Sequence, residues 1–234
     1  MMHTAQQHES HPHPTLLSDF ILGSQDGLVN VLGIILGLTA ATHDLRLILV
    51  ATFAALGAES ISMGAVAFTS TRARRRLYVS EMNRERQEMR DVPEVERQEV
   101  RTVLQNWGYE GAELDELLER ISGNPKAMLE FMMAFELELA PVSEPQARNS
   151  ALIVGGATVV GSFIPLLPFL VPNVPIDSAL VAAVILSAIT LFLIGLYEAR
   201  TTSGSIWKSG LQMVLIGLAA GFAGFAIGHF LGAS

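Results

Sequence analysis

Carboxylates at helical spacing are the side chains in this sequence best suited to chemistry. Glu81, Glu85 and Glu88 are spaced i, i+4 and i+7, and Glu96 and Glu99 are spaced i and i+3. Residues three or four apart lie on one face of a helix, so each set presents its carboxylates together. Two Glu-x-x-Glu pairs on neighbouring helices can converge on divalent cations, as they do in carboxylate-containing helix bundles.

The alternative for these glutamates is an exposed helix face on which they pair with arginine, and spacing alone favours that alternative. Residues 110–144 shift the balance toward a cation site, because they hold nine acids and two bases and so attract cations. In the same segment, Met132 and Met133 precede Glu136 and add two thioethers beside a carboxylate. The interleaved arginines are Arg84, Arg86, Arg90, Arg97 and Arg101.

Two further carboxylates, Asp26 and Glu59, lie within long apolar stretches. A charge in lipid is costly, so such residues usually face a polar path, a partner or an ion; the alternative is a position near the membrane surface. Asn30 follows Asp26 by four residues and Met63 follows Glu59 by four, so each shares its carboxylate's helix face. Together they would form a mixed oxygen–sulfur site that suits Fe²⁺ or Mn²⁺ better than Mg²⁺ or Ca²⁺. For Met63, ordinary packing is the alternative.

The N-terminal tail, residues 1–19, contains His8, His11 and His13 in a polar, proline-containing context. These histidines could bind a transition metal, but the composition favours an unstructured tail. His229 is isolated near the other end of the chain, and we assign it no role.

The elements that position these groups follow from composition. Of 234 residues, 50% are hydrophobic and only 16% are charged, whereas a soluble domain has about 25% charged residues. Five stretches reach roughly the 20 residues that cross a bilayer as a helix. We therefore expect an all-α protein with five transmembrane helices, at residues 20–42, 47–71, 150–172, 178–197 and 209–232.

Residues 72–148 have the opposite composition and are expected to form a water-facing helical insert. They hold 16 of the 23 acids and 12 of the 15 bases. Nothing interrupts the helical pattern between Ser70 and Met89, so the second membrane helix should continue into the insert. Apolar spacing with Pro and Gly boundaries predicts further helices from Pro93, over 112–122 and over 125–140. The expected organisation is thus a tail (1–19), helices 1–2 (20–71), the insert (72–148) and helices 3–5 (149–234).

Absent residues and net charge limit the possible functions. The chain has no cysteine, which excludes disulfides, thiolate zinc sites and iron–sulfur clusters. Its net charge of −8 argues against nucleic acid as a partner. We expect no permanently bound cofactor, with the partners being membrane lipid, divalent cations, protons and a second copy of the chain.

Lysine and arginine predict the orientation. The segments 1–19, 72–149 and 198–208 hold 14 of the 15 bases, and the opposite side holds only Arg46. Positive charge near the spans marks the cytosolic side, so the N-terminus and insert should be cytosolic and the C-terminus outside. We expect a multi-pass integral protein of the cell (inner) membrane.

Glycines indicate where helices approach closely. Gly33 and Gly37 form a G-x-x-x-G motif, and a longer glycine series runs from Gly217 to Gly232. Either could be a subunit interface and the other internal packing. A single five-span subunit has few helices with which to enclose a hydrated path, so we expect a two-fold homodimer with the first helices near its axis.

Several of these motifs occur in the order typical of one family. They are Asp26-Gly27-Leu28-Val29, Ile61-Ser62-Met63-Gly64, Phe131-Met132-Met133 leading to Glu136-Leu137, and Ile164-Pro165-Leu166-Leu167-Pro168. Over residues 17–232 the chain resembles the vacuolar iron transporter family.

The resemblance implies a homodimer of five-span subunits that moves Fe²⁺, and often Mn²⁺, out of the cytosol against protons. It implies that Asp26 and Met63 are pathway residues. The cytosolic metal ligands it implies are Glu85, Glu88, Glu96, Glu99 and Glu136, with Met132 and Met133 nearby.

This chain departs from the family pattern at one pathway position. The family commonly has an acid where this chain has Ala55, and the only acid on that helix is Glu59, one turn further along. We therefore expect Glu59 to substitute for the missing acid and to form the transport site with Asp26, Asn30 and Met63.

The function expected from the sequence is export of Fe²⁺, with Mn²⁺ as a second ion, in exchange for protons, and we do not expect an enzyme. Two alternatives remain: a membrane-anchored metal buffer or sensor, and a ferroxidase-type membrane enzyme. Against the latter, the insert lacks the Glu-x-x-His ligands of di-iron bundles, since no histidine lies between residues 44 and 228.

Overall fold

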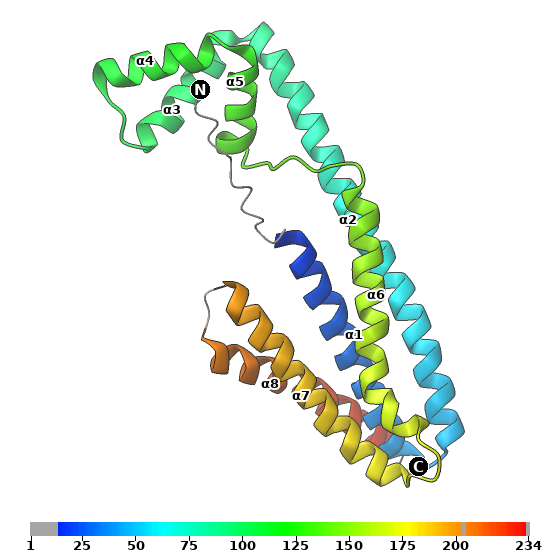
Figure 1. The fold of residues 1–234 in the computed structure, drawn as a ribbon. Coiled ribbons are helices and arrows are strands. Elements are labelled where there is room, and N and C mark those ends of the chain that lie inside the picture. Colours follow the sequence, from blue (N-terminus) through cyan, green and yellow to red (C-terminus); the bar gives the residue numbers. More distant parts are fainter. Residues whose placement is uncertain (1–13, 203–204, 233–234) are drawn as a thin grey trace, which may run out of the picture. The chain divides into compact units, whose positions relative to one another are not determined.

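The computed structural model describes residues 14–202 and 205–232, and within these ranges it is helical with no strand. The expected all-α class is therefore confirmed. The expectation for His8, His11 and His13 lies outside the described residues. The long helices are α1 (Pro14–Ala41), α2 (Leu45–Asp91), α6 (Gln146–Leu166), α7 (Ile176–Thr202) and α8 (Ile206–Gly232) (Figure 1).

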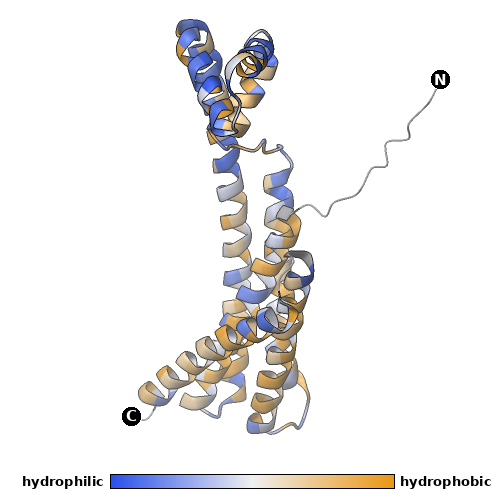
Figure 2. Ribbon diagram, turned by 90° about the vertical axis from the view of Figure 1, so that its left-hand side faces the viewer, coloured by the Kyte–Doolittle hydropathy of each residue, from blue (hydrophilic) through white to orange (hydrophobic). Residues whose placement is uncertain are grey.

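These five helices are long and apolar enough to cross a membrane, which confirms the expected number of spans. Figure 2 shows hydrophobic residues along them and hydrophilic residues through the upper part of α2 and the short helices. Helix α1 begins six residues earlier than expected, at Pro14. Proline suits the first turn of a helix, because N–H groups in that turn have no acceptor within the helix and the missing N–H of proline costs nothing there.

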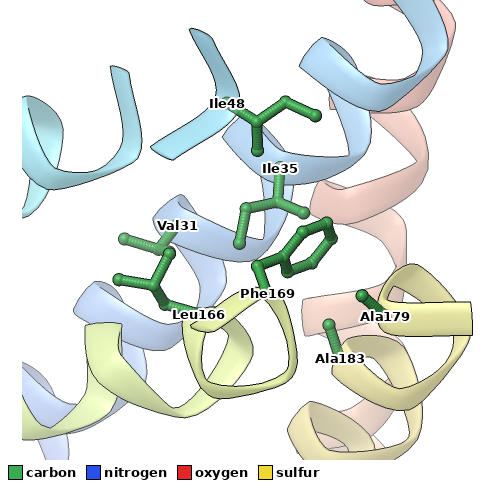
Figure 3. Close-up of a cluster of buried hydrophobic side chains, with 7 residues drawn as sticks. All are labelled: Val31, Ile35, Ile48, Leu166, Phe169, Ala179 and Ala183. Carbon is green, nitrogen blue, oxygen red and sulfur yellow. The ribbon is translucent and has the colours of Figure 1, made fainter. Parts of the chain in front are cut away.

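The chain divides into two compact units, residues 1–68 with 148–234, and residues 69–147. We call them the membrane unit and the insert unit; helix α2 contributes to both. The membrane unit has a hydrophobic core in which α1, α2, α6, α7 and the short 3₁₀ helix η2 (Leu167–Leu170) meet. Figure 3 shows this core around Phe169, with Ile35 and Ile48 on one side and Ala179 and Ala183 on the other.

Helices α1 and α6 approach so closely that glycine is required between them. A Cβ atom on Gly27 would collide with the carbonyl oxygen of Thr158, and one on Gly161 would collide with the carbonyl oxygen of Ser24. Backbone groups cannot move aside as side chains can, so these glycines fix the helix spacing. The spacing matters because the same part of α1 carries Asp26.

The two glycine series pack against each other within one chain. Gly224 and Gly228 of α8 meet the backbone of Gly33 and Gly37 of α1. Both series therefore serve internal packing. Close packing against α8 already accounts for glycine at positions 33 and 37, so a subunit contact is not needed to explain these two residues.

The insert unit contains the end of α2, helices α3 (Pro93–Asn106), α4 (Gly111–Ser122) and α5 (Pro125–Phe131), and the π-helix η1 (Met132–Glu136). Its core is formed by buried apolar side chains from α3, α4, α5 and η1. Asn124 caps α5, because its side-chain oxygen accepts hydrogen bonds from the backbone N–H groups of Lys126 and Ala127. The buried core residues are Val100, Leu104, Leu114, Leu118, Met128, Phe131 and Met132.

The sequence predicted one helix over 125–140, but the α-helix ends at Phe131 and a π-helical turn follows. The backbone N–H of Leu137 donates to the carbonyl of Met132 over 3.0 Å, which is the five-residue spacing of a π-helix. Glu138 then has a positive φ of 52° and ends the helix. Apolar periodicity does not distinguish a π-turn from an α-turn, so the spacing alone could not predict this ending.

Candidate metal centre

Three of the predicted glutamates converge where α2 passes into α3. Glu85 and Glu88 lie on the last turns of α2 and Glu96 on the first turns of α3, with Pro93 starting the second helix. One carboxylate oxygen from each lies within 4.8 Å of the other two. A single divalent ion could therefore contact all three, and carboxylate ligands suit hard divalent ions, Mn²⁺ among them.

Burial makes this cluster unlike an exposed acidic face. Glu85 and Glu96 are each only 2% exposed, and the Oε2 atom of Glu96 has no hydrogen-bond partner among the described residues. A buried carboxylate oxygen without a hydrogen-bond partner is costly, so a proton or a cation is expected to bind at Glu96.

The electrostatics extend the cluster to Glu99 and Glu136. Burial, followed by repulsion from Glu99 and Glu85, raises the pKa of Glu96 to about 7. Burial also raises the pKa of Glu136 to about 7, again with repulsion from Glu99 and Glu85. For Glu85, burial and then repulsion from Glu88 raise the pKa. All five predicted glutamates thus share one negative field, although only Glu85, Glu88 and Glu96 bring ligand atoms together.

Arg84 is the cation that pairs with this cluster. Its guanidinium lies 2.8 Å from Glu81, 3.5 Å from Glu85 and 3.5 Å from Glu88. The neighbouring carboxylates, Glu81 first, raise its pKa. From the sequence, Arg84 was only one of five interleaved arginines. Its spacing from Glu81 (i−3) and Glu88 (i+4) on one helix could have identified it as the arginine that pairs with these glutamates.

The two predicted methionines have different surroundings. Met132 is fully buried in the apolar core of the insert unit, so its position is explained by packing. Met133 is 2% exposed and lies in the π-helix with Glu136, whose Oε2 is buried without a partner among the described residues. π-Turns are frequent at functional sites because they re-aim side chains. Met133 is therefore the stronger candidate for a sulfur contact.

In the membrane unit, an amide joins the two predicted carboxylates. Asn30 of α1 donates a hydrogen bond to Glu59 of α2 and a longer one, 3.4 Å, to Asp26 one turn earlier on α1. Asp26 and Glu59 are half-buried, and Asn30 is exposed on the surface of the single chain. The structure thus brings together Asp26, Asn30 and Glu59. Met63 lies one turn further along α2 and is half-buried.

The sequence missed a second polar contact between membrane helices. Ser150 of α6 donates a hydrogen bond to Asp19 of α1. The two residues are 131 positions apart, and neither belongs to a recognisable motif, so only the fold reveals the pair.

Comparison with known proteins places the chain in a family. The model of the VIT family matches residues 17–229, which is most of the sequence. The chain belongs to the VIT family. The resemblance inferred from its motifs is thereby confirmed.

Named relatives of this VIT-family chain are aligned over nearly its whole length. Vacuolar iron transporter 1 of Arabidopsis thaliana is 33% identical over 227 residues, covering 96% of this chain and 90% of that protein. The vacuolar iron transporter of Plasmodium falciparum is 28% identical over 223 residues, covering 92% and 82%. Protein CCC1 of Saccharomyces cerevisiae is 25% identical over 223 residues, covering 92% and 69%.

The relatives' names bear on two expectations from the sequence. Names that describe transporters agree with the expectation that this chain is not an enzyme. They also refer to the vacuole, whereas the sequence led us to expect the cell (inner) membrane.

Proposed function

We propose that this chain exports Fe²⁺ from the cytosol in exchange for protons, with Mn²⁺ as a second substrate ion. The observation that carries the proposal is the convergence of Glu85, Glu88 and Glu96, of which Glu85 and Glu96 are buried, in a five-span member of the VIT family. Relatives named as iron transporters support iron as the substrate. Oxygen ligands with a methionine nearby would accept Mn²⁺ as well.

The insert unit would collect the ion. A carboxylate must be deprotonated before it binds a metal, so metal binding here releases protons. Glu96 and Glu136, with pKa values raised to about 7, would still hold part of their protons in a neutral cytosol. Capture of the ion would thus be linked to proton release in the insert unit itself.

The membrane unit would pass the ion along Asp26, Asn30 and Glu59, with Met63 one turn away. Glu59 accepts a hydrogen bond from Asn30 of α1. This contact supports the proposal that Glu59 replaces the acid that the family commonly has at the position of Ala55. The two carboxylates and the amide oxygen offer successive hard ligands on facing helices. Alternate binding of metal and proton by one carboxylate is a direct route to exchange.

A homodimer is part of this proposal, because Asn30 is exposed on the single chain. Lipid cannot satisfy an amide and its neighbouring carboxylates, so a second copy should cover this face. A cysteine at Ile34, beside the cavity that Asn30 lines, should crosslink two subunits in membranes. Crosslinking from Leu215 of α8 but not from Ile34 would place the interface elsewhere.

Flux in proteoliposomes tests the function as a whole. The flux of each ion would be measured with and without a pH gradient, for Fe²⁺, Mn²⁺, Co²⁺, Zn²⁺ and Ca²⁺. The proposal requires Fe²⁺ flux that a pH gradient drives. Binding without flux would instead indicate a metal buffer or sensor, and oxygen consumption with Fe²⁺ would indicate a ferroxidase.

The predicted orientation and host membrane need a separate measurement. Protease protection of tags at the two termini, in intact cells and in isolated vacuoles where the host has them, reports both. We expect the N-terminus in the cytosol, the C-terminus outside, and the cell (inner) membrane as the location. Protection of the C-terminal tag within vacuoles would contradict that location and agree with the relatives' names.

A further inference from the structure

The insert unit contains a cavity whose lining residues are separate from the glutamate cluster of Glu85, Glu88 and Glu96. It has a volume of about 670 Å³ and is lined by residues from the end of α2, the start of α3, the end of α4 and α5. Small-molecule sites commonly have volumes of about 300–1,000 Å³, so the cavity is large enough for an organic ligand. A single inorganic ion would fill little of it.

The charge of the cavity is opposite to that of its surroundings. Four of the five charged side chains that line it are basic, and Glu94 is the one acid. In residues 69–147 as a whole, acids outnumber bases 16 to 11. A local excess of positive charge in an acidic unit is not an average property of this surface. The basic residues are Arg86, Arg90, Arg97 and Lys126.

Two of these cations have no carboxylate partner in the described part of the chain. Neither Arg86 nor Arg90 makes an ion pair with a described residue. Arg97 uses one nitrogen for Glu119 at 2.7 Å, which leaves further N–H donors on its guanidinium. Lys126 lies 3.8 Å from Glu130 with both side chains exposed, a weak pairing that an incoming anion can replace.

The rest of the lining is suited to the apolar body of a ligand and to one further hydrogen bond. Met89, Met128 and Leu129 provide an apolar wall that continues into the core of the insert unit. Ser122 also lines the cavity, and its buried hydroxyl has no hydrogen-bond partner among the described residues. Basic groups and an unused donor beside an apolar wall match a molecule that is anionic at one end and apolar at the other.

We infer that this cavity binds a phosphate-bearing organic anion, with its phosphates on Arg86, Arg90 and Arg97 and its organic part against Met89 and Met128. Guanidinium groups bind phosphate oxygens in bidentate fashion, which explains arginine at three of the four basic positions. The phosphate could belong to a soluble nucleotide or to a phosphorylated lipid headgroup. The inference does not depend on the proposed transport activity.

Binding to the purified full-length protein tests the inference. Calorimetry would be carried out in EDTA without divalent ions, so that no probe attaches through a metal on the glutamate cluster. The probes are ATP, inositol trisphosphate as a soluble lipid headgroup, and inorganic phosphate. We expect saturable binding of ATP or inositol trisphosphate that is tighter than binding of inorganic phosphate. The tighter of the two organic probes identifies the source of the phosphate.

Two variants and a matched control locate the site. The double variant Arg86→Gln, Arg90→Gln should weaken binding of the organic probe at least about tenfold, and Lys126→Glu should weaken it independently. The double variant Arg101→Gln, Arg120→Gln removes the same charge from the same unit but lies outside the cavity, and it should bind normally. Equal losses in both double variants, or no binding of either organic probe by the unaltered protein, would overturn the inference.

Discussion

Glu96 is the carboxylate at which a proton and a metal ion would compete most directly. Its side chain is buried, one of its oxygens has no partner among the described residues, and its pKa is raised to about 7. An ordinary glutamate has a pKa near 4.3 and would be fully ionised at neutral pH. At this position a small change in pH changes the charge of the site.

We expect Mn²⁺ affinity of the insert to rise with pH between 6 and 8. Glu96 and Glu136, with pKa values of about 7, are mostly protonated at pH 6 and mostly ionised at pH 8. Because the metal binds only the ionised form, affinity should be at least about tenfold weaker at pH 6, measured by calorimetry. The double variant Glu96→Gln, Glu136→Gln should bind weakly at both values. Equal affinity of the unaltered protein at pH 6 and 8 would contradict the raised pKa values.

Replacing Glu96 and Glu99 with Ala should remove at least one Mn²⁺ site from the titration. Glu96 is positioned to provide a ligand oxygen, and Glu99 adds negative charge that would attract a cation. Glu113 and Glu116 have the same i, i+3 spacing but are exposed on α4, so their double alanine variant is the matched control. If both pairs leave stoichiometry and affinity unchanged, the cluster is only an acidic surface.

Glu59→Gln should abolish proton-coupled metal flux while binding by the insert persists. Glutamine keeps the shape of the side chain and its contact with Asn30 but removes the ionisable group. Moving the acid back one turn, as Ala55→Glu with Glu59→Ala, should restore part of the flux in proteoliposomes. Full transport by Glu59→Gln with an unchanged pH dependence would leave Asp26 as the candidate membrane carboxylate.

At the scale of the helix, glycine contacts set where these carboxylates lie. Gly27 follows Asp26 directly, and its hydrogen atom faces the backbone of α6. The distance between α1 and α6 therefore depends on one missing side chain.

Gly27→Ala should destabilise the protein by about 1–3 kcal/mol, the usual cost of forcing an extra group into a packed interface. The new Cβ would collide with the carbonyl oxygen of Thr158. Gly57→Ala on α2 is the control, because nothing lies within 4 Å of its added Cβ. Alanine there should be neutral or stabilise the helix by up to about 1 kcal/mol. Thermal unfolding in detergent compares the two, and equal midpoints would show that α1 and α6 can separate without cost.

Local spacing predicted the helices and which glutamates share a helix face, because both depend on residues three or four apart. It could not predict that Glu96 of α3 meets Glu85 of α2, since that depends on the angle at which Pro93 starts a new helix. The sequence placed Asn30 and Glu59 in one expected site, but the hydrogen bond that Asn30 donates to Glu59 and the pairing of the two glycine series required the tertiary structure. The predicted end of the helix over 125–140 was wrong, because the spacing of apolar residues does not distinguish a π-turn from an α-turn.

At the scale of the whole molecule, each compact unit has its own hydrophobic core. Each unit also contains one of the two tryptophans. Trp107 packs on Phe131 and Phe135 in the insert unit, and Trp207 packs on Phe192 in the membrane unit. Fluorescence can therefore follow the two units separately.

Mn²⁺ should raise the unfolding midpoint reported by Trp107 more than that reported by Trp207, because the convergent glutamate cluster lies in the insert unit. A ligand at 100 times its Kd stabilises the unit that binds it by about 2.7 kcal/mol. The variants Trp207→Phe and Trp107→Phe isolate the two signals, and the same variants carrying Glu96→Ala serve as the control. Equal shifts in both variants would show that the two units unfold together.

The pairing of Arg84 with three glutamates has a consequence for metal homeostasis in the cell. Arg84 belongs to the same chain and competes with the metal for these carboxylates at every metal concentration. The apparent Kd is therefore the intrinsic Kd divided by the fraction of time that the carboxylates are free of Arg84. Under the proposed export of iron, a higher apparent Kd means that more free iron is needed before the site is half-saturated. The protein would then export little iron while iron is scarce and more as iron accumulates. Arg84→Gln should lower the free-iron concentration at which export is half-maximal and so lower the iron content of cells that produce the variant.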